Sequence, residues 1–436
     1  MRYQPDELDD VPVLWRGDVV VVGGGSAGAT AAVASARAGA RTLLLESGGF
    51  LGGTGTRILD TFYGIYTPGE ANNRVAGGIG WEVCLELAKR GMSFERPNTY
   101  GAGTGVTYEP EALKVVWDEM VDGSGASLVL HALVTAVVMD GQRVVGVVAE
   151  TRRGPGQVLA HVVIDASGEA EVAWRAGSTT SNARELTDLQ PATATFRVGP
   201  VADDAATSRE IHDLLKTAAS SGQYRLPRLE GSIHATTVPG VRHANMTRVA
   251  GKDLTDPWQL TWAEQEGRRQ VVEYIRFLRD KVPGYGDAFL LGTSPRLGIR
   301  ESRRLDGEYV LDRQDFAGPL THLDDIGVCG QPIEDHSAGS ATRWEYVGGD
   351  PVPNDLTYGI PFGTLVPRVV DGLLVAGRCL AATHEAHASV RSIGQCMAMG
   401  HAAGVAAAMA SDAAVTPRAV DRLQLRHLLA DAGAIL

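Results

Sequence analysis

Residues 18–53 read DVVVVGGGSAGATAAVASARAGARTLLLESGGFLGG, and this stretch decides the fold. Its four valines, Val19–Val22, predict a buried strand that runs directly into glycines spaced G-x-G-x-x-G. A helix of small residues follows, and a second apolar strand over 42–45 ends at Glu46. The order of strand, glycine turn, helix, strand and acidic residue is typical of a βαβ unit that holds a dinucleotide.

The glycines and the acidic residue each have a physical role in such a unit. Gly23 permits the tight turn, Gly25 lets the backbone approach a pyrophosphate, and Gly28 lets the helix lie close to the sheet. The free N–H groups at the start of the helix favour negative charge. Glu46 is placed to accept hydrogen bonds from an adenosine ribose, and its charge would repel a 2′-phosphate. FAD or NAD is therefore favoured over NADP.

Composition narrows the class of protein. The chain has 436 residues, 44% hydrophobic and 21% charged, which is enough for two or three domains. Its net charge of −12, without a long Lys/Arg block, argues against nucleic-acid binding. The acidic N-terminus is unlike a secretion signal and no apolar stretch approaches about 18 uninterrupted residues, so we expect a cytoplasmic protein with no membrane partner. The four cysteines lack C-x-x-C spacing, so we expect neither a metal site nor a disulfide framework.

A glycine-rich loop follows Glu46 directly. The glycines in residues 47–56 let the backbone pass close to a flat ligand, and the hydroxyl groups supply hydrogen-bond donors. We therefore expect cofactor contacts from Ser47, Gly52, Gly53, Thr54 and Gly55.

Residues 128–168 have the alternating pattern of strands. Three strands joined by glycine-containing turns predict a β-meander. The last strand ends in Asp-Ala-Ser-Gly, at the sheet edge where ligands of open α/β folds gather. From this region we expect cofactor contacts from Leu133, Ala166, Ser167 and Gly168.

The spacing of apolar residues predicts two scaffold helices. In the helix over 77–92, Trp81, Leu85 and Ala88 lie along one face. The helix over 258–280 ends before a proline, and we expect its aromatic side chains to belong to the core.

The chain divides into a second domain and a return to the first. Residues 186–355 have irregular hydrophobicity, aromatic patches and many arginines, and we expect an α+β substrate or cap domain there. Residues 1–185 and 356–436 then form a discontinuous cofactor domain. The expected fold is α/β, with a parallel Rossmann-like sheet, the β-meander and the second domain.

The end of the chain completes the cofactor site. An apolar strand ends in Gly377 and Arg378, and an alanine-rich helix follows over 393–410. The N–H groups at the start of that helix, near Ile393 and Gly394, would face the flavin's C2 carbonyl and stabilise negative charge on the reduced ring.

Several motifs along the chain carry a family resemblance. They are GGGSAGATAAVASARAGARTLLLE, GGFLGGTGT, VVIDASGEAEVAWRAG, GIRESRRLDGEYVL and LLVAGRCLAATHEAHASVRSIGQCMAMGHAAG. Together they resemble the FAD-dependent oxidoreductase family with a glutathione-reductase-type FAD fold, in the subgroup that is similar to fumarate reductase flavoproteins. The resemblance covers the two ends of the chain well and the middle by short motifs.

The resemblance implies a two-domain flavoprotein with FAD between the Rossmann-like domain and a substrate cap. Positions that match the family's motifs imply FAD contacts at Gly23, Gly25, Ser26, Gly28, Glu46, Gly53, Thr54, Gly377 and Arg378. We also expect a contact from Ala27, which lies between two of them. Similar fumarate reductases carry a histidine in the second glycine loop that tethers FAD, whereas residues 47–57 contain none, so we expect non-covalent FAD. No second G-x-G-x-x-G follows a strand, so a separate NAD(P)H domain is not expected.

Flavin oxidation of a C–H bond needs a proton acceptor, and an anionic substrate needs positive charge. His336 and His384 lie in segments that should line the flavin, and either is a candidate base. Arg300, Arg303 and Arg391 are candidates for contacts to a substrate carboxylate or the flavin, with helix-end or ion-pair roles as the alternative. Tyr358 is a candidate hydrogen-bond donor to substrate, with a buried aromatic plug as the alternative.

These observations predict an FAD-dependent dehydrogenase or oxidase that transfers hydride from a small organic substrate to flavin N5. One alternative is a flavin-dependent reductase of an activated double bond, with Arg300 as proton donor. Another is an electron-transfer flavoprotein without its own substrate, and aromatic hydroxylation would need NAD(P)H and oxygen together. The sequence identifies neither the substrate nor the electron acceptor, and a homodimer is one option for the assembly.

Overall fold

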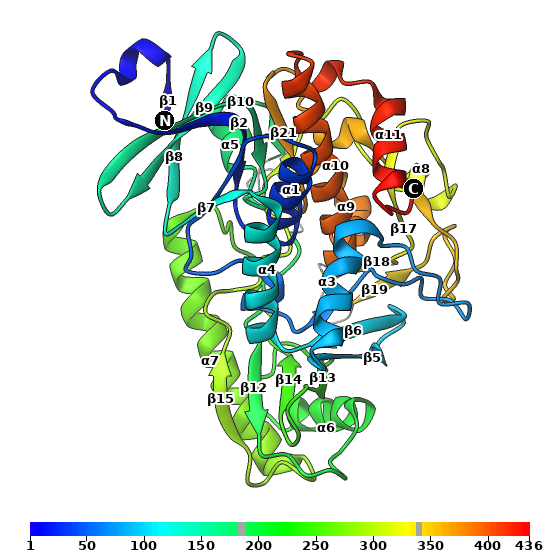
Figure 1. Cartoon of the computed structure of the whole chain (residues 1–436). Coiled ribbons are helices and arrows are strands. Elements are labelled where there is room, and N and C mark those ends of the chain that lie inside the picture. Colours follow the sequence, from blue (N-terminus) through cyan, green and yellow to red (C-terminus); the bar gives the residue numbers. More distant parts are fainter. Residues whose placement is uncertain (182–188, 337–341) are drawn as a thin grey trace.

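An eight-stranded sheet joins the first and last parts of the chain (Figure 1). The computed structural model describes residues 1–181, 189–336 and 342–436. The strand order is β1-β8-β9-β10-β2-β3-β7, and β21 pairs with one half of β10. The strands are β1 (Arg2–Tyr3), β2 (Val13–Val22), β3 (Thr42–Glu46), β7 (Ser127–Leu130), β8 (Leu133–Asp140), β9 (Arg143–Thr151), β10 (Gly154–Asp165) and β21 (Leu373–Val375).

The centre of this sheet is parallel, as predicted. β2 pairs in parallel with β3 on one side and β10 on the other, so that Val22 lies opposite both Leu45 and Asp165. β21 pairs in parallel with β10 and places Val375 opposite Asp165. The chain therefore leaves these strands at one edge of the sheet, where α1 (Ser26–Arg37) begins.

The antiparallel meander contains β8, β9 and β10, but its first strand is shorter than predicted. The chain turns at His131, whose φ is 56°, and the residues before it pair in parallel with β3 as β7. The prediction of one continuous strand was wrong here. Apolar residues continue on both sides of His131, so the sequence pattern does not mark the break.

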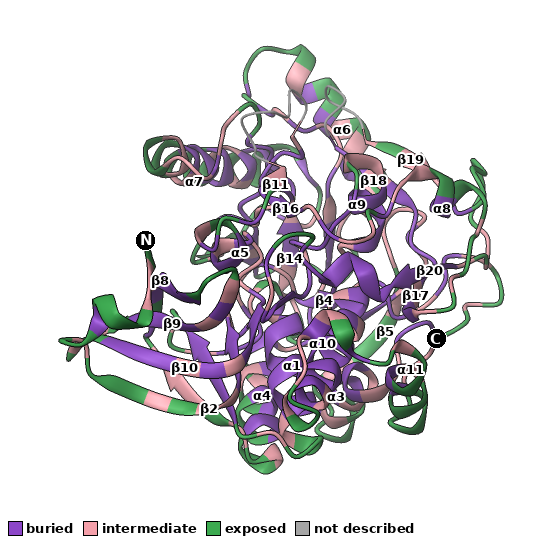
Figure 2. Cartoon of the chain, turned by 90° about the horizontal axis from the view of Figure 1, so that it is seen from above, coloured by how far each residue is buried: buried purple, intermediate pink, exposed green. Residues whose placement is uncertain are grey.

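Helices α1 and α10 (Ile393–Asp412) join the two ends of the chain and lie side by side in Figure 1. A Cβ at Gly400 would lie 2.1 Å from the Ala27 carbonyl oxygen, and one at Gly404 2.4 Å from that of Ala31. Small residues therefore allow this close packing. Within the described residues α10 alone is long and apolar enough to cross a membrane, but 83% of its apolar window is buried in the protein (purple in Figure 2), as in a core helix.

Helix α3 (Gly78–Lys89) forms where the sequence predicts it, but another face is buried. Ile79, Val83 and Leu87 face the core. Leu85, on the face that the sequence analysis singled out, is 42% exposed. The helix carries more than one apolar stripe, and packing against its neighbours selects which one is buried.

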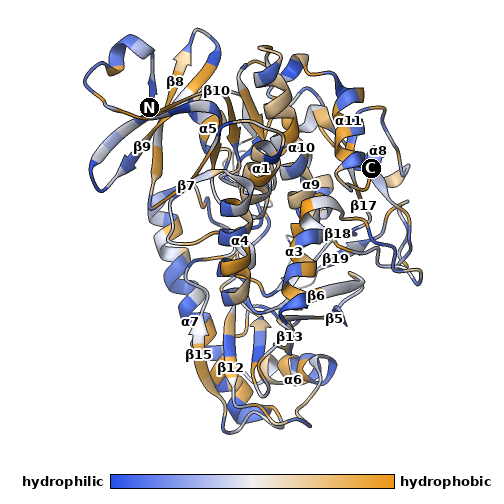
Figure 3. Cartoon of the chain, viewed as in Figure 1, coloured by the Kyte–Doolittle hydropathy of each residue, from blue (hydrophilic) through white to orange (hydrophobic). Residues whose placement is uncertain are grey.

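A smaller unit, at the bottom of Figure 1, has its own hydrophobic core. Its antiparallel sheet has the order β13-β14-β12-β15 and contacts two helices. Tyr274 and Phe277 of the predicted long helix are fully buried, whereas Trp262 is 40% exposed. Only some of the aromatic side chains of this helix therefore belong to the core. That helix, α7, is largely hydrophilic in Figure 3, as expected for one buried face. The elements are β12 (Phe196–Gly199), α6 (Ser208–Ser220), β13 (Ser232–Ala235), β14 (Arg242–Asn245), α7 (Pro257–Lys281) and β15 (Phe289–Thr293).

The second core is smaller than the predicted cap domain. Its buried residues lie between Ala192 and Leu297. Leu311 and Ile333, inside the predicted cap, pack instead into the core around α1 and α10. We therefore propose that the cap ends near residue 297 rather than at 355. The other predicted boundary, between 185 and 186, lies outside the described residues.

Short elements complete the described chain. The helices are α2 (Thr54–Arg57), α4 (Pro110–Ser124), α5 (Glu171–Arg175), α8 (Arg313–Ala317), α9 (His384–Val390) and α11 (Arg422–Asp431), with 3₁₀ turns at Pro5–Leu8, Phe362–Leu365 and Pro417–Ala419. The strands are β4 (Thr61–Phe62), β5 (Ser93–Pro97), β6 (Thr104–Tyr108), β11 (Thr180–Ser181), β16 (Arg304–Leu305), β17 (Asp325–Cys329), β18 (Ile333–Asp335), β19 (Arg343–Glu345) and β20 (Tyr358–Pro361).

Candidate active site

A cavity of about 790 Å³ connects the edge of the large sheet with the smaller unit. Strand ends such as Val22 and Leu45 line it on one side. Arg228 and Asn245 of the smaller unit line it on the other. A volume of this size suits a cofactor together with a small substrate.

Most of the predicted cofactor residues line this cavity. They are Gly23, Gly25, Ser26, Ala27, Glu46, Ser47, Gly53, Thr54, Leu133, Ala166, Ser167, Gly168, Gly377, Arg378 and Ile393. The others, Gly28, Gly52, Gly55 and Gly394, lie behind the lining. A Cβ at Gly28 would lie 1.7 Å from the Gly23 carbonyl oxygen, and one at Gly394 2.3 Å from that of Gly64, so these glycines allow close backbone packing.

The glycine turn leaves room and hydrogen-bond donors for a pyrophosphate. Gly23 has a φ of +99°, which favours glycine, and a Cβ at Gly53 would lie 2.7 Å from the Cα of Gly25. Helix α1 begins at Gly25 without a side-chain cap, so its first N–H groups can donate to a bound anion. These features fit the diphosphate part of FAD.

Glu46 is held in place at the end of β3. Its carboxylate accepts hydrogen bonds from the backbone N–H of Gly24 at 2.8 Å and of Gly48 at 2.6 Å, and pairs with Arg57 at 2.7 Å. Burial raises the pKa of Glu46, but the contacts from Arg57 and the backbone outweigh it and lower the pKa overall. The carboxylate is therefore ionised where the sequence predicts a ribose contact, and Arg57 is a lining residue that sequence reasoning missed.

The other side of the cavity is lined by three arginines that form no close ion pair. Arg228, Arg300 and Arg391 form no ion pair within the described part of the chain; they donate to oxygens of Asn245, to the carbonyl of Pro191 and to that of Glu334. Burial, and then the charges of Arg228 and Arg391, lower the pKa of Arg300 well below its usual range. This wall therefore carries excess positive charge.

His336 and Glu334 lie beside these arginines and line the cavity. His336 Nε2 lies 3.0 Å from a Glu334 carboxylate oxygen. Burial and the charge of Arg300 lower the pKa of His336 to about 3, so this imidazole is neutral at pH 7. Burial raises the pKa of Glu334, but His336, Arg391 and Arg300 outweigh it and lower the pKa to about 2.

The structure does not bring His384 or Tyr358 to the cavity lining. His384 Nδ1 lies 2.9 Å from Glu301 and Nε2 lies 3.5 Å from Asp335, and hydrogen bonds to these two carboxylates raise its pKa to about 9. Tyr358 is fully buried, and its hydroxyl lies 2.7 Å from Ser389 Oγ. Of the predicted catalytic residues, Arg300, Arg391 and His336 line the cavity.

Sequence reasoning missed several large side chains of the lining, some of them in the smaller unit. The missed side chains include Arg57, Tyr100, Arg228, Asn245, Arg296, Glu334 and Trp344. These residues are scattered along the chain, and no motif marks them. Only Glu334 carries a signal, because it lies on the short strand β18 two residues before the predicted base His336.

Comparisons with known proteins agree with this architecture. The sequence model of the family described as FAD dependent oxidoreductase matches residues 18–429. A solved structure of a geranylgeranyl bacteriochlorophyll reductase-like protein from Thermoplasma acidophilum is 14% identical, with a TM-score of 0.50 over 96% of this chain and 84% of that chain. A flavin-dependent brominase is also 14% identical, with a TM-score of 0.47 over 95% of this chain and 83% of that chain.

At 14% identity the Thermoplasma acidophilum structure shows a shared fold alone, and no curated protein matched the sequence. The fumarate-reductase-like subgroup stays a prediction. The family match spans nearly the whole chain and includes both the glycine cradle and the cavity. The chain belongs to the FAD-dependent oxidoreductase family, and FAD is its cofactor.

Proposed function

We propose that this enzyme oxidises a small organic anion. The substrate loses a hydride from carbon and a proton from the attached oxygen or nitrogen. FAD, when bound, supplies the acceptor for the two electrons of the hydride. Non-covalent attachment of FAD, a cytoplasmic location and a homodimer stay predictions.

The observation that carries this proposal is the arginine wall, which we define as Arg228, Arg300 and Arg391. A buried charge without a partner is costly, because the protein interior does not replace the water that it loses. The Nε atoms of Arg228 and Arg391 are buried and have no hydrogen-bond partner within the described residues. A carboxylate in the cavity would satisfy these groups, with the planar guanidinium geometry favouring two parallel hydrogen bonds.

His336 is the better of the two candidate bases. A proton acceptor must be unprotonated at the working pH and within reach of the substrate. His336 lines the cavity, and its pKa of about 3 leaves it unprotonated at pH 7, although so low a pKa makes it a weak base. His384 does not line the cavity, and its pKa of about 9 leaves it protonated at pH 7. Because His336 Nε2 lies 3.0 Å from Glu334, the proton would be accepted at Nδ1, which lies 2.8 Å from Thr342 Oγ1, and Glu334 would stabilise the imidazolium.

One observation favours the reverse reaction, reduction of an activated double bond. The pKa of Arg300 is lowered by burial and by its neighbouring guanidinium groups, so Arg300 releases a proton more readily than an exposed arginine does. In that reaction the arginine would supply the proton that adds to the double bond.

Anaerobic spectroscopy of the purified holoenzyme tests the proposal. We expect a panel of 2-hydroxy and 2-amino acids to include a compound that bleaches the flavin absorbance without any other reductant. The matching amides, which lack the negative charge, should bleach it far more slowly. Bleaching only by an external reductant, followed by reoxidation by an unsaturated acid, would support the reductase. Electron exchange only with a partner protein would support an electron-transfer role.

Replacing the base gives a second test. In a His336→Gln variant we expect the anaerobic bleaching rate to fall by about 10²-fold or more, because general-base assistance is lost. FAD content should stay unchanged, and His427→Gln, at an exposed position on α11, is the matched control. A His336→Gln rate within about twofold of the wild type would rule out this base.

A further inference from the structure

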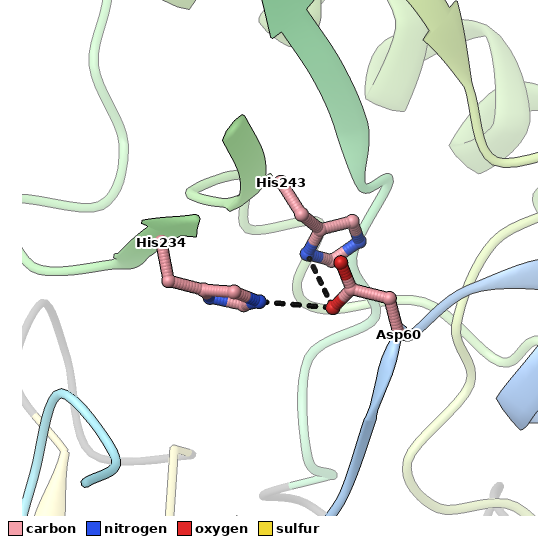
Figure 4. Close-up of side chains that lie close together, drawn as sticks. All are labelled: Asp60, His234 and His243. Carbon is pink, nitrogen blue, oxygen red and sulfur yellow. Dashed lines mark hydrogen bonds and ion pairs between the residues drawn. The ribbon is translucent and has the colours of Figure 1, made fainter. Parts of the chain in front are cut away.

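A second cluster of titratable side chains lies outside the cavity lining (Figure 4). Asp60 comes from the segment between α2 and β4, whereas His234 and His243 lie opposite each other on β13 and β14. Their exposed fractions are 1%, 9% and 4%. Segments about 170 residues apart therefore converge at a closed site where the large unit meets the smaller one.

The three side chains present ligand atoms to one point. Asp60 Oδ1 lies 2.9 Å from His234 Nε2 and 3.5 Å from His243 Nδ1. The donor atoms of all three residues lie within 4.8 Å of one another. Donor atoms around a tetrahedral zinc ion with bonds of about 2.0–2.1 Å lie roughly 3.3 Å apart, so this spacing needs little adjustment to bind a metal.

The hydrogen bonding of His243 leaves one ring nitrogen available to a metal ion. His243 Nε2 lies 3.1 Å from the carbonyl oxygen of Ile58 and donates to it. Nδ1, which lies 3.5 Å from Asp60 Oδ1, is buried and has no hydrogen-bond partner within the described residues. The lone pair of Nδ1 can therefore bind a cation beside the carboxylate.

The second oxygen of Asp60 is unsatisfied. Asp60 Oδ2 is buried and has no hydrogen-bond partner within the described residues. A buried carboxylate oxygen without a partner is unusual. A metal ion bound by both carboxylate oxygens would satisfy Oδ2 and supply a fourth ligand atom.

We propose that Asp60, His234 and His243 form a structural site for a divalent transition metal, with zinc as the best match. Two imidazoles and one carboxylate suit zinc, whereas calcium and magnesium prefer a shell of oxygen ligands. The bond from His243 to the Ile58 carbonyl is the outer-shell contact that fixes the orientation of a metal-binding histidine. The metal would hold the segment of Asp60 against the smaller sheet. This site differs from the sequence-based expectation of no metal, which rested on the cysteines.

The surrounding charges predict a moderate affinity. Arg197 is paired with Glu109 at 3.4 Å, and Arg96 donates to the hydroxyls of Thr61 and Thr107. The positive charge of Arg96 stays close to the cluster and partly offsets the single negative charge of Asp60. We therefore expect weaker binding than at zinc sites built from thiolates.

Metal content of the tag-free holoenzyme tests the proposal. After dialysis against a chelator, then against buffered zinc, and then desalting, we expect about one zinc ion per FAD by mass spectrometry. Asp60→Asn and His243→Gln should each retain less than about a fifth of that amount and should lose the rise in Tm that zinc gives the wild type. A wild-type enzyme that retains no zinc, or variants that retain as much as the wild type, would overturn the site.

A matched control variant and a measurement on the wild type keep the test valid even if these variants do not fold. His322 Nε2 lies 3.0 Å from Asp315 Oδ1, a histidine–aspartate pair outside the three-residue cluster, and His322→Gln should retain zinc as the wild type does. X-ray absorption of the zinc-loaded wild type needs no variant. We expect nitrogen and oxygen ligands with the scattering of two imidazoles; sulfur ligands, or no imidazole scattering, would contradict the assignment.

Discussion

The two ends of the cavity are built in different ways. At the sheet edge, the lining is mostly backbone and small side chains from short contiguous stretches around Gly23, Gly53 and Gly168. At the far end, large polar side chains such as Arg228 and His336 come from separate parts of the chain. The first arrangement suits binding of the cofactor that the family shares. In the second, the identities of the side chains determine which substrate binds.

The charges at the two ends differ in the same way. Arg57 at the cofactor end of the cavity is paired with Glu46 at 2.7 Å, so the charges of these two side chains balance each other without a bound ligand. The arginine wall forms no ion pair among the described residues, and the single ionised carboxylate of Glu334 beside it leaves an excess of positive charge. The difference indicates that the cofactor end is complete in itself, whereas the substrate end needs an anion to complete it.

The largest expected effect comes from adding one methyl group at the cradle. In Gly28→Ala the new Cβ would lie 1.7 Å from the Gly23 carbonyl oxygen, so α1 must move away from the turn. We expect stability to fall by about 3 kcal/mol and FAD binding to be largely lost. FAD content and thermal unfolding measure both.

Gly123→Ala is the matched helical control. A Cβ there meets no atom within 4 Å, so this variant should gain about 1 kcal/mol from helix propensity and keep its FAD. If both variants kept their FAD, the cradle would not depend on close backbone packing, and the contrast between the two ends would fail.

The next effect is a loss of substrate affinity without loss of FAD. In Arg300→Met we expect kcat/KM for the acid substrate to fall by about 10²- to 10³-fold, because a buried contact to a charged ligand is worth about 2–5 kcal/mol. The smaller reactivity of the matching amide should hardly change. Arg209→Met, at an exposed position on α6, is the control. Equal losses for acid and amide would show that Arg300 does not recognise charge.

The smallest effect concerns a histidine behind the cavity. The folded-state pKa of His384, about 9, lies above its usual value of 6.5, so its stabilisation is fully present below pH 6.5 and is lost as pH rises through about 9. We expect about 1–2 kcal/mol of this effect after solvent screening. Urea unfolding across this pH range should show the decline in the wild type and not in His384→Gln. A decline of the same size in both proteins would assign it to other groups.

Local chemistry explains which parts of the site were predictable. The residues from Val19 to Glu46 carry their own signal, because strand, turn and helix preferences act over short distances. The buried face of α3 was not predictable, since Leu85 and Leu87 are equally apolar and only the neighbouring helices decide which is covered. His384 lies in a motif that resembles the family, yet neither His384 nor Tyr358 lines the cavity.

By itself, the sequence determined the βαβ unit, the choice of a dinucleotide cofactor, and the return of the chain to that unit through an apolar strand and a small-residue helix. Tertiary structure alone decided that Arg228, Arg300 and Arg391 share one wall and that Asp60 meets His234 and His243. The reason is physical: backbone conformation is encoded by adjacent residues, whereas convergence of distant side chains depends on how whole units pack.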